Sequence, residues 1–125
     1  MDLGATAARL LEDAKSTETV AGTTLVHALV DLDRGEMMEL SRLLTREGGR
    51  VALLASERDG RGTLFVGSTE PKVSAQAMLD AAMEKFAGKG GGNPSAATAV
   101  GEPGHPLAGA LAAARKAARE AAGVG

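Results

Sequence analysis

Residues 88–92 contain four glycines in five positions, arranged around Lys89 and followed by Asn93 and Pro94. Glycine lowers helix propensity and permits positive φ, so successive peptide N–H groups can converge on one point. Because side chains are missing, a phosphate or a sugar can approach this backbone closely, and Lys89 adds a mobile positive charge. The alternative is a helix that stops at glycine and continues into a flexible linker. The run therefore predicts either an anion-binding loop or a linker.

Two common nucleotide-binding loops do not fit this run. A Walker A loop requires G-x-x-x-x-G-K-[ST] at the start of a helix, but Lys89 precedes the triple glycine and the run follows a helical stretch. The G-x-G-x-x-G fingerprint also fails, since its last position falls on Asn93 when counted from Gly88 and on Ser95 when counted from Gly90. We expect no ATP or dinucleotide binding through either loop type.

Residues that could catalyse a reaction are scarce. The two histidines are His27 and His105, whereas a catalytic metal site usually needs three or more converging His or carboxylate ligands. We interpret His27 as a hydrogen-bonded structural histidine within a strand, and His105 as a cap of the last helix. Asp31 and Asp33 flank a turn, where capping is the expected role. No Asp-His-His triplet is present, so we expect no catalytic residues, no metal site and no cofactor in this chain.

Three cations near the end of the chain form a second candidate site: Arg115, Lys116 and Arg119. Cations at this spacing can follow a phosphate backbone without reading bases. The alternative is the solvated face of an alanine-rich helix. The formal net charge of −2 argues against indiscriminate nucleic-acid binding but permits a local basic patch.

The residues around the glycine run carry a family resemblance. Residues 73–79 read Val-Ser-Ala-Gln-Ala-Met-Leu, and residues 86–97 read Phe-Ala-Gly-Lys-Gly-Gly-Gly-Asn-Pro-Ser-Ala-Ala. This resembles the "vsA" helix start, the "gGkGGGrp" motif and the small-residue stretch of the DHH-associated C-terminal domain. That domain ends alanyl-tRNA synthetases and many DHH phosphoesterases, and the resemblance covers roughly residues 23–122. The phosphoesterase branch usually carries histidine at the position of Asn93, so the chain resembles the synthetase branch more. Synthetase members commonly continue into a glutamine and a second glycine cluster, whereas residues 97–101 read Ala-Thr-Ala-Val-Gly.

The resemblance implies a non-catalytic domain that binds tRNA at its elbow, helps aminoacylation and editing modules act on one tRNA, and often dimerises. The implied parent enzyme is an alanine–tRNA ligase, and the implied partners are the tRNA for alanine, the rest of the synthetase and a second copy of the chain. The residues implied to contact RNA are Lys89, Gly90, Gly91, Gly92 and Asn93, with electrostatic support from Arg115, Lys116 and Arg119.

Two alternatives stay open. The chain could be the substrate-binding half of a DHH phosphoesterase, in which the glycines hold the nucleotide 3′ to the cleaved phosphate. It could also be a purely structural dimerisation module whose glycine run contacts nothing.

The length and composition of the chain fit a single small domain. A chain of 125 residues suits one modest domain, and it has no cysteine for disulfides or thiolate metal sites. The first residues lack the basic and apolar regions of a secretory signal, and no apolar run approaches the roughly 20 residues that span a bilayer. We expect a cytoplasmic protein without membrane contact.

The spacing of apolar residues predicts the helices and strands that position these candidate residues. Apolar residues recur at helical spacing over residues 3–14, and they alternate as in a strand over residues 23–32. Asp33 and Glu36 form a capping box for a helix that ends at Gly48 and Gly49. The remaining expected elements are a buried strand at 51–55, a hairpin at 59–60, a returning strand at 64–66, a helix from 75 to 86, a short edge strand at 96–100 and a helix that begins at Pro106.

This order predicts an α+β (mixed α/β) fold, with a small mixed sheet of three to four strands packed by helices. We expect residues 1–22 to form a helical arm or the end of a linker helix, and residues 23–125 to form the domain. The apolar stripe of the arm either docks on its own domain or belongs to a longer self-associating helix.

Overall fold

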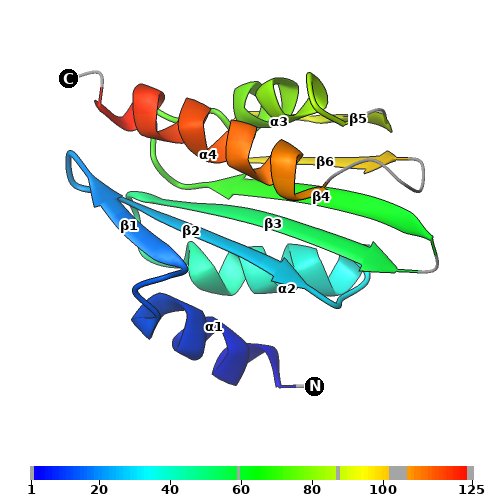
Figure 1. Ribbon diagram of the computed structural model, residues 1–125. Helices are drawn as coiled ribbons and strands as arrows, with labels where there is room; N and C mark the ends of the chain where they lie inside the picture. The colour runs from blue at the N-terminus through cyan, green and yellow to red at the C-terminus, as the bar shows by residue number, and fades with distance from the viewer. Residues whose placement is uncertain (1, 59, 87, 102–106, 124–125) are drawn as a thin grey trace.

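The computed structural model describes residues 2–58, 60–86, 88–101 and 107–123. Four helices and six strands follow one another along the described chain (Figure 1). They are α1 (Leu3–Glu12), β1 (Thr17–Val20), β2 (Thr23–Val30), α2 (Arg34–Leu44), β3 (Arg50–Arg58), β4 (Arg61–Ser68), α3 (Ala75–Met83), β5 (Gly88–Gly92), β6 (Ala96–Gly101) and α4 (Leu107–Gly123). The strands form one sheet in the order β1-β2-β3-β4-β6-β5. Only β2 and β3 pair in parallel, and every other neighbouring pair is antiparallel.

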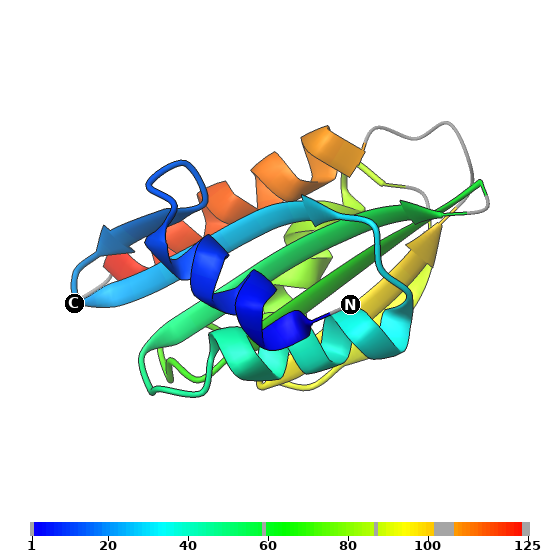
Figure 2. The same cartoon turned by 90° about the horizontal axis from the view of Figure 1, so that it is seen from below.

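Helices cover both faces of this sheet. The views in Figure 1 and Figure 2 place α3 and α4 on one face, and α1 and α2 on the other. Side chains alternate along each strand, so Leu25 and Val51 belong to the core under α3 and α4, whereas Val26 and Ala52 belong to the core over α1 and α2. Strand β3 is buried on both faces from Val51 to Ser56, as its continuous apolar run predicts.

The parallel pair requires a crossover, and helix α2 provides it. Asp33 caps its first turn by accepting a hydrogen bond from the backbone N–H of Glu36, and Glu36 accepts one from the N–H of Asp33. The expected capping box is therefore confirmed. Arg50 lies beyond the other end of the helix and donates to the carbonyl of Leu44, which stabilises a terminus with unpaired carbonyl groups.

The helix α4 packs closely because its buried side is mostly alanine. Ala110, Ala114, Ala118 and Ala122 recur every fourth residue and are buried against the sheet and α3. Lys72 donates to the carbonyl of Ala122 near the end of the helix, where a positive charge is favourable. The expected start of this helix at Pro106 and the expected cap at His105 lie outside the described residues.

The fold class is confirmed, but the sheet has six strands instead of three or four. One additional strand is β1, which lies within the segment expected to be a helical arm. The other is β5, which is the glycine run itself. The expected edge strand β6 exists, but it lies between β4 and β5 and is not at the edge.

The apolar stripe of α1 docks on its own domain. Ala7 and Leu10 are buried in the same cluster as Met37 and Leu40 of α2. Within the described residues, no helix has both the length and the apolar character that crossing a membrane requires.

Candidate nucleic-acid interface

The glycine run forms the last strand of the sheet, so the expectation of a loop with positive φ is wrong. Residues 88–92 pair antiparallel with β6, from Gly88 opposite Gly101 to Gly92 opposite Ala97. In the described residues, the glycines with positive φ are Gly22, Gly49 and Gly60, all of them in turns. Because β5 ends the strand order, its outer side presents backbone N–H and C=O groups that no other strand of the described residues pairs with.

The neighbouring strand β6 leaves no room for a side chain at Gly90 or Gly92. A Cβ at Gly90 would overlap the carbonyl oxygen of Thr98 and lie 2.5 Å from the Cα of Ala99. A Cβ at Gly92 would likewise lie 2.5 Å from the Cα of Ala97. These glycines allow the backbones of β5 and β6 to approach more closely than side chains would permit.

Gly91 differs from its neighbours, since a Cβ there would meet nothing within 4 Å. Its lack of a side chain is therefore not required by packing, and it leaves a bare stretch of backbone. Lys89 is exposed on the same strand and provides its only charged side chain. The combination of bare backbone and a nearby ammonium group suits a polyanion.

Asn93 has a structural role in the turn between β5 and β6. Its side-chain oxygen accepts hydrogen bonds from the backbone N–H groups of Ser95, at 2.8 Å, and Ala96, at 3.1 Å. This is the local side-chain-to-backbone bonding that favours Asn in turns. The oxygen of Asn93 is thus occupied within the fold.

A cleft of about 280 Å³ adjoins the bare backbone on the α2 side of the sheet. Gly91 and Gly92 line one wall, and Arg34 and Met38 of α2 line the other. Met38 is 59% exposed, although it is a large apolar residue. Sequence reasoning did not connect Arg34 with the glycine run, because nothing in the sequence shows that α2 leaves this part of the sheet uncovered.

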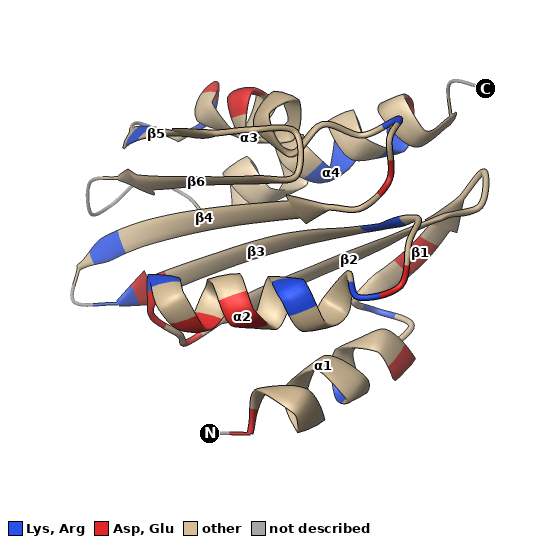
Figure 3. Ribbon diagram, turned by 180° about the vertical axis from the view of Figure 1, so that it is seen from behind, with Lys and Arg blue, Asp and Glu red and all other residues tan. Residues whose placement is uncertain are grey.

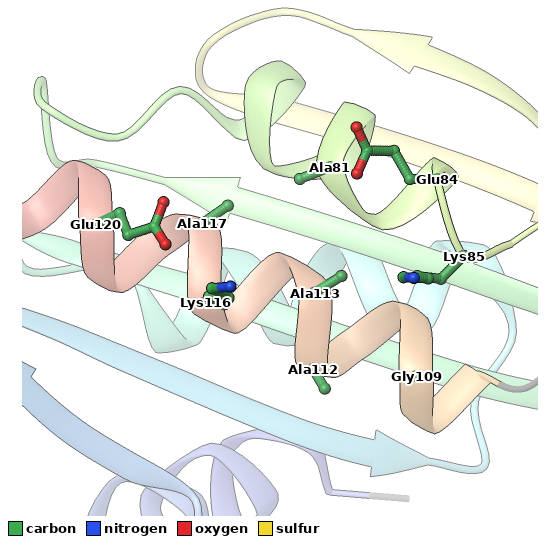
Figure 4. Close-up of a pocket in the computed structure, with 9 residues that line it drawn as sticks. All are labelled: Ala81, Glu84, Lys85, Gly109, Ala112, Ala113, Lys116, Ala117 and Glu120. Carbon is green, nitrogen blue, oxygen red and sulfur yellow. The ribbon is translucent and has the colours of Figure 1, made fainter.

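Lys116 lies in a different hollow, a groove of about 490 Å³ between α3 and α4. Figure 4 shows Glu84 and Lys85 on the α3 side of the groove, and Lys116 and Glu120 on the α4 side. Lys85 follows α3 and precedes β5, so it lies in the segment that leads to Lys89. The groove therefore contains charges of both signs.

Arg115 and Arg119 lie on the far side of the sheet from Lys89. Arg119 donates to both carboxylate oxygens of Glu18 in β1, at 2.8 and 2.9 Å, and Arg115 lies 3.7 Å from the same carboxylate. The hydrogen bond from Arg119 is the main reason why the pKa of Glu18 is lowered from 4.5. Strands β1 and β5 are the two edges of the sheet, about 24 Å apart at about 4.8 Å per strand. The residues expected to contact RNA therefore do not form one patch (Figure 3).

His27 lies beside this ion pair and is half-buried. Burial is the main cause of its lowered pKa, from 6.5, and the charge of Arg115 adds to it. Its backbone N–H donates to the carbonyl of Ser16 at 2.8 Å, but the described residues include no hydrogen-bond partner for its ring. The expectation of a hydrogen-bonded ring stays a prediction. Among residues 2–58, 60–86, 88–101 and 107–123, no three His, Asp or Glu side chains gather as a metal ion would require.

The family described as the DHHA1 domain matches residues 22–123. The chain belongs to the DHHA1 domain family. Alanine–tRNA ligases contain similar sequences: that of Neisseria meningitidis serogroup C (strain 053442) is 37% identical over 98 residues, which are 75% of this chain and 11% of the enzyme. That of Stenotrophomonas maltophilia (strain K279a) is 40% identical over 77 residues, which are 59% of this chain and 9% of the enzyme. This DHHA1 domain spans about a tenth of the length of these relatives.

Two solved structures share the fold of this DHHA1 domain. The C-Ala domain of Aquifex aeolicus alanyl-tRNA synthetase superposes with a TM-score of 0.69 at 21% identity, over 86% of this chain and 97% of that one. RecJ from Thermus thermophilus superposes with a TM-score of 0.58 at 24% identity, over 91% of this chain and 18% of that one. At these identities the likeness concerns the fold alone.

Proposed function

We propose that this domain is the non-catalytic, tRNA-binding part of an alanine–tRNA ligase. The sequence similarity to alanine–tRNA ligases supports this parent enzyme, and the likeness to the C-Ala domain supports the same architecture. In this role the domain holds the tRNA elbow while other parts of the synthetase aminoacylate and edit. A second copy of the chain remains a proposed partner, with the mass of the purified domain in solution as its test.

The observation that carries this proposal is the bare backbone at Gly91 beside the exposed Lys89. Phosphates and riboses are commonly bound through backbone N–H groups and lysines, which position a nucleic acid without reading its sequence. The edge of β5 offers such donors, and the space at Gly91 lets a ribose or a base approach them. Folded RNA is recognised chiefly by shape, which suits a short rigid edge with few charges.

The structure limits which cations can contribute. Glu18 holds Arg119 and lies near Arg115, so these two arginines begin partly neutralised at the other edge of the sheet. We therefore assign the proposed contact to residues 89–92 with Arg34, which lines the same cleft as Gly91, as the nearby cation. We expect Asn93 to act through the turn that it stabilises.

A binding experiment on two matched variants tests this proposal. Gly91→Val places a branched side chain on the bare backbone, and Gly48→Val does the same in the turn between α2 and β3. A Cβ at either glycine meets nothing within 4 Å. We expect Gly91→Val to weaken binding of alanine tRNA about tenfold, equivalent to about 1.4 kcal/mol, and Gly48→Val to leave it unchanged. Fluorescence anisotropy with labelled tRNA measures both, and equal affinities for the two variants would contradict the proposal.

A comparison of two RNA ligands tests whether the domain recognises the tRNA elbow. Intact tRNA carries the elbow, whereas a hairpin of its acceptor stem does not, so we expect the intact tRNA to bind much more tightly. Equal binding of the hairpin would refute elbow recognition while leaving RNA binding in place. Cleavage of a short oligonucleotide by the chain together with a DHH catalytic half would instead favour the phosphoesterase alternative.

A further inference from the structure

The edge of the sheet opposite the glycine strand is only half covered. Strand β1 pairs with β2 from Thr23 to Val26, and the carbonyl of Ser16 accepts the N–H of His27. Beyond this point β2 continues to Val30 with β3 on one side and, within the described residues, no strand on the other side, as Figure 1 shows. The reason lies in the chain path, because α1 approaches β1 from the other face of the sheet, so no described segment lies in line with β1 at this edge.

The backbone at this open position is oriented for strand pairing. The N–H of His27 points toward β1, and backbone groups in a strand alternate in direction, so the N–H and C=O of Leu29 point toward the same side. The described residues provide no backbone partner for them on this side, and Leu29 is 63% exposed. An added strand that runs in line with β1 would pair with these groups.

Helix α4 turns this edge into a groove. A hollow of about 330 Å³ lies between the edge and the helix, with Leu29, Ala108, Leu111 and Ala112 as its apolar lining. Leu29 faces α4 because it lies two residues after His27, on the same side of β2 as Leu25. The side chain of an added strand that points toward α4 would fill this hollow.

One cation, Arg115, lies at one end of the groove. Arg115 and His27 line the hollow next to Ser16, where β1 begins. The Nε atom of Arg115 is buried without a hydrogen-bond partner in the described residues, and Glu18 pairs mainly with Arg119. Arg115 is 30% exposed and thus has donors free for an anion.

We propose that this groove binds the C-terminal end of an extended peptide, which adds to β2 as an antiparallel strand and places its carboxylate beside Arg115 and His27. The direction follows from β1: a strand in line with it, running the same way, ends where Arg115 and His27 lie. The opposite direction would bring an amino terminus to the guanidinium of Arg115, which is unfavourable. The side chain opposite Leu29 should be apolar and of moderate size. The proposal is independent of RNA binding at β5.

The test uses the peptide acetyl-Thr-Val-Thr-Val with a free carboxylate and the same peptide with a C-terminal amide. We expect saturable binding of the free carboxylate, with amide signals of Ala28 to Val30 shifting in NMR spectra, and at least tenfold weaker binding of the amide. Arg115→Gln should abolish this difference between the two peptides. Saturation that is absent up to about 10 mM peptide would overturn the proposal, as would equal binding of both peptides or shifts confined to other elements.

A pair of surface variants provides the control. Leu29 and Met38 are both large exposed apolar residues, but they lie on opposite faces of the sheet. Leu29→Asp should abolish peptide binding, and Met38→Asp should leave it intact, with similar unfolding midpoints for both. If tRNA shifts the signals of Leu29 and displaces the peptide, the groove belongs to the RNA surface and the peptide proposal is wrong.

Discussion

Alanine substitutions at adjacent glycines of β5 test the reason for its composition. Gly90→Ala places a methyl group against the carbonyl oxygen of Thr98, 2.5 Å from the Cα of Ala99. In folded proteins a Cβ atom essentially never lies within 3.0 Å of a backbone atom, and the backbone cannot rotate away as a side chain can. The strand β5 must therefore move away from β6 in this variant. Gly91→Ala adds the same methyl group to open space.

The two substitutions should change the stability of the domain in opposite directions. Overpacking of this kind costs about 1–3 kcal/mol, so Gly90→Ala should destabilise the domain by that amount. Gly91 has no positive φ, and alanine at a compatible position stabilises by about 0.4–1 kcal/mol through the unfolded chain. At about 4 °C per kcal/mol, the melting temperatures of the two variants should lie roughly 6–16 °C apart.

Thermal and urea unfolding, followed by circular dichroism, measure this difference. Both variants change one glycine of the same strand to the same residue, so composition and location are matched. Equal melting temperatures would refute the argument that the spacing of β5 and β6 requires Gly90. A melting temperature of Gly91→Ala below that of the wild-type chain would refute the argument that Gly91 is free of packing constraints.

Three further predictions concern pH, a buried hydroxyl and salt. The folded state lowers the pKa of His27 from 6.5, so the folded state binds fewer protons than the unfolded state. The free energy of unfolding should therefore be highest above about pH 6.5 and decrease below it. His27→Gln should remove this decrease, as measured by urea unfolding midpoints down to about pH 5.5. Ser56 accepts the N–H of Leu32 and donates to its carbonyl, so Ser56→Ala should cost about 1–3 kcal/mol in urea unfolding, and a loss near zero would contradict this. With Lys89 and Arg34 as the main contacts, the log–log salt slope of tRNA affinity should be about 1.5 in magnitude, and a slope several times steeper would indicate generic electrostatic binding.

Much of the fold could be predicted because periodicity and local capping agree with it. The alternation in β2 and the capping box of Asp33 and Glu36 each depend on neighbours in the sequence. The expected helix end at Gly48 and Gly49 is wrong, since α2 ends at Leu44. The buried stripe of α3, which includes Met78 and Leu79, was predictable for the same reason.

Strand β5 could not be predicted, because glycine has low strand propensity and no apolar alternation. It becomes a strand because β6 offers a backbone to pair with at a distance that only glycine tolerates at Gly90 and Gly92. Its partner β6 contains Ala97 and lies in the segment where synthetase members commonly carry a second glycine cluster.

The arrangement of the candidate residues could not be predicted from the sequence. Lys89 and the glycines form an edge strand of the sheet, whereas their types predicted a loop or a linker. The pairing of Arg119 with Glu18 joins residues that are 101 positions apart, so no local pattern reveals it. It holds Arg119 at the β1 edge, and Arg115 lies beside the same carboxylate, so neither arginine shares a surface with Lys89.

The composition of β5 also has a dynamic consequence. Neither apolar core of the described residues includes a residue of this strand, so its attachment depends on the backbone ladder to β6. Detachment of β5 would expose little apolar surface, and its local unfolding should cost far less free energy than global unfolding. Amides of β5 that bond to β6 should therefore exchange with solvent deuterium long before those of β3. A ligand that grips the outer edge of β5 would slow this exchange, so the strand would respond to occupancy while the rest of the sheet stays rigid.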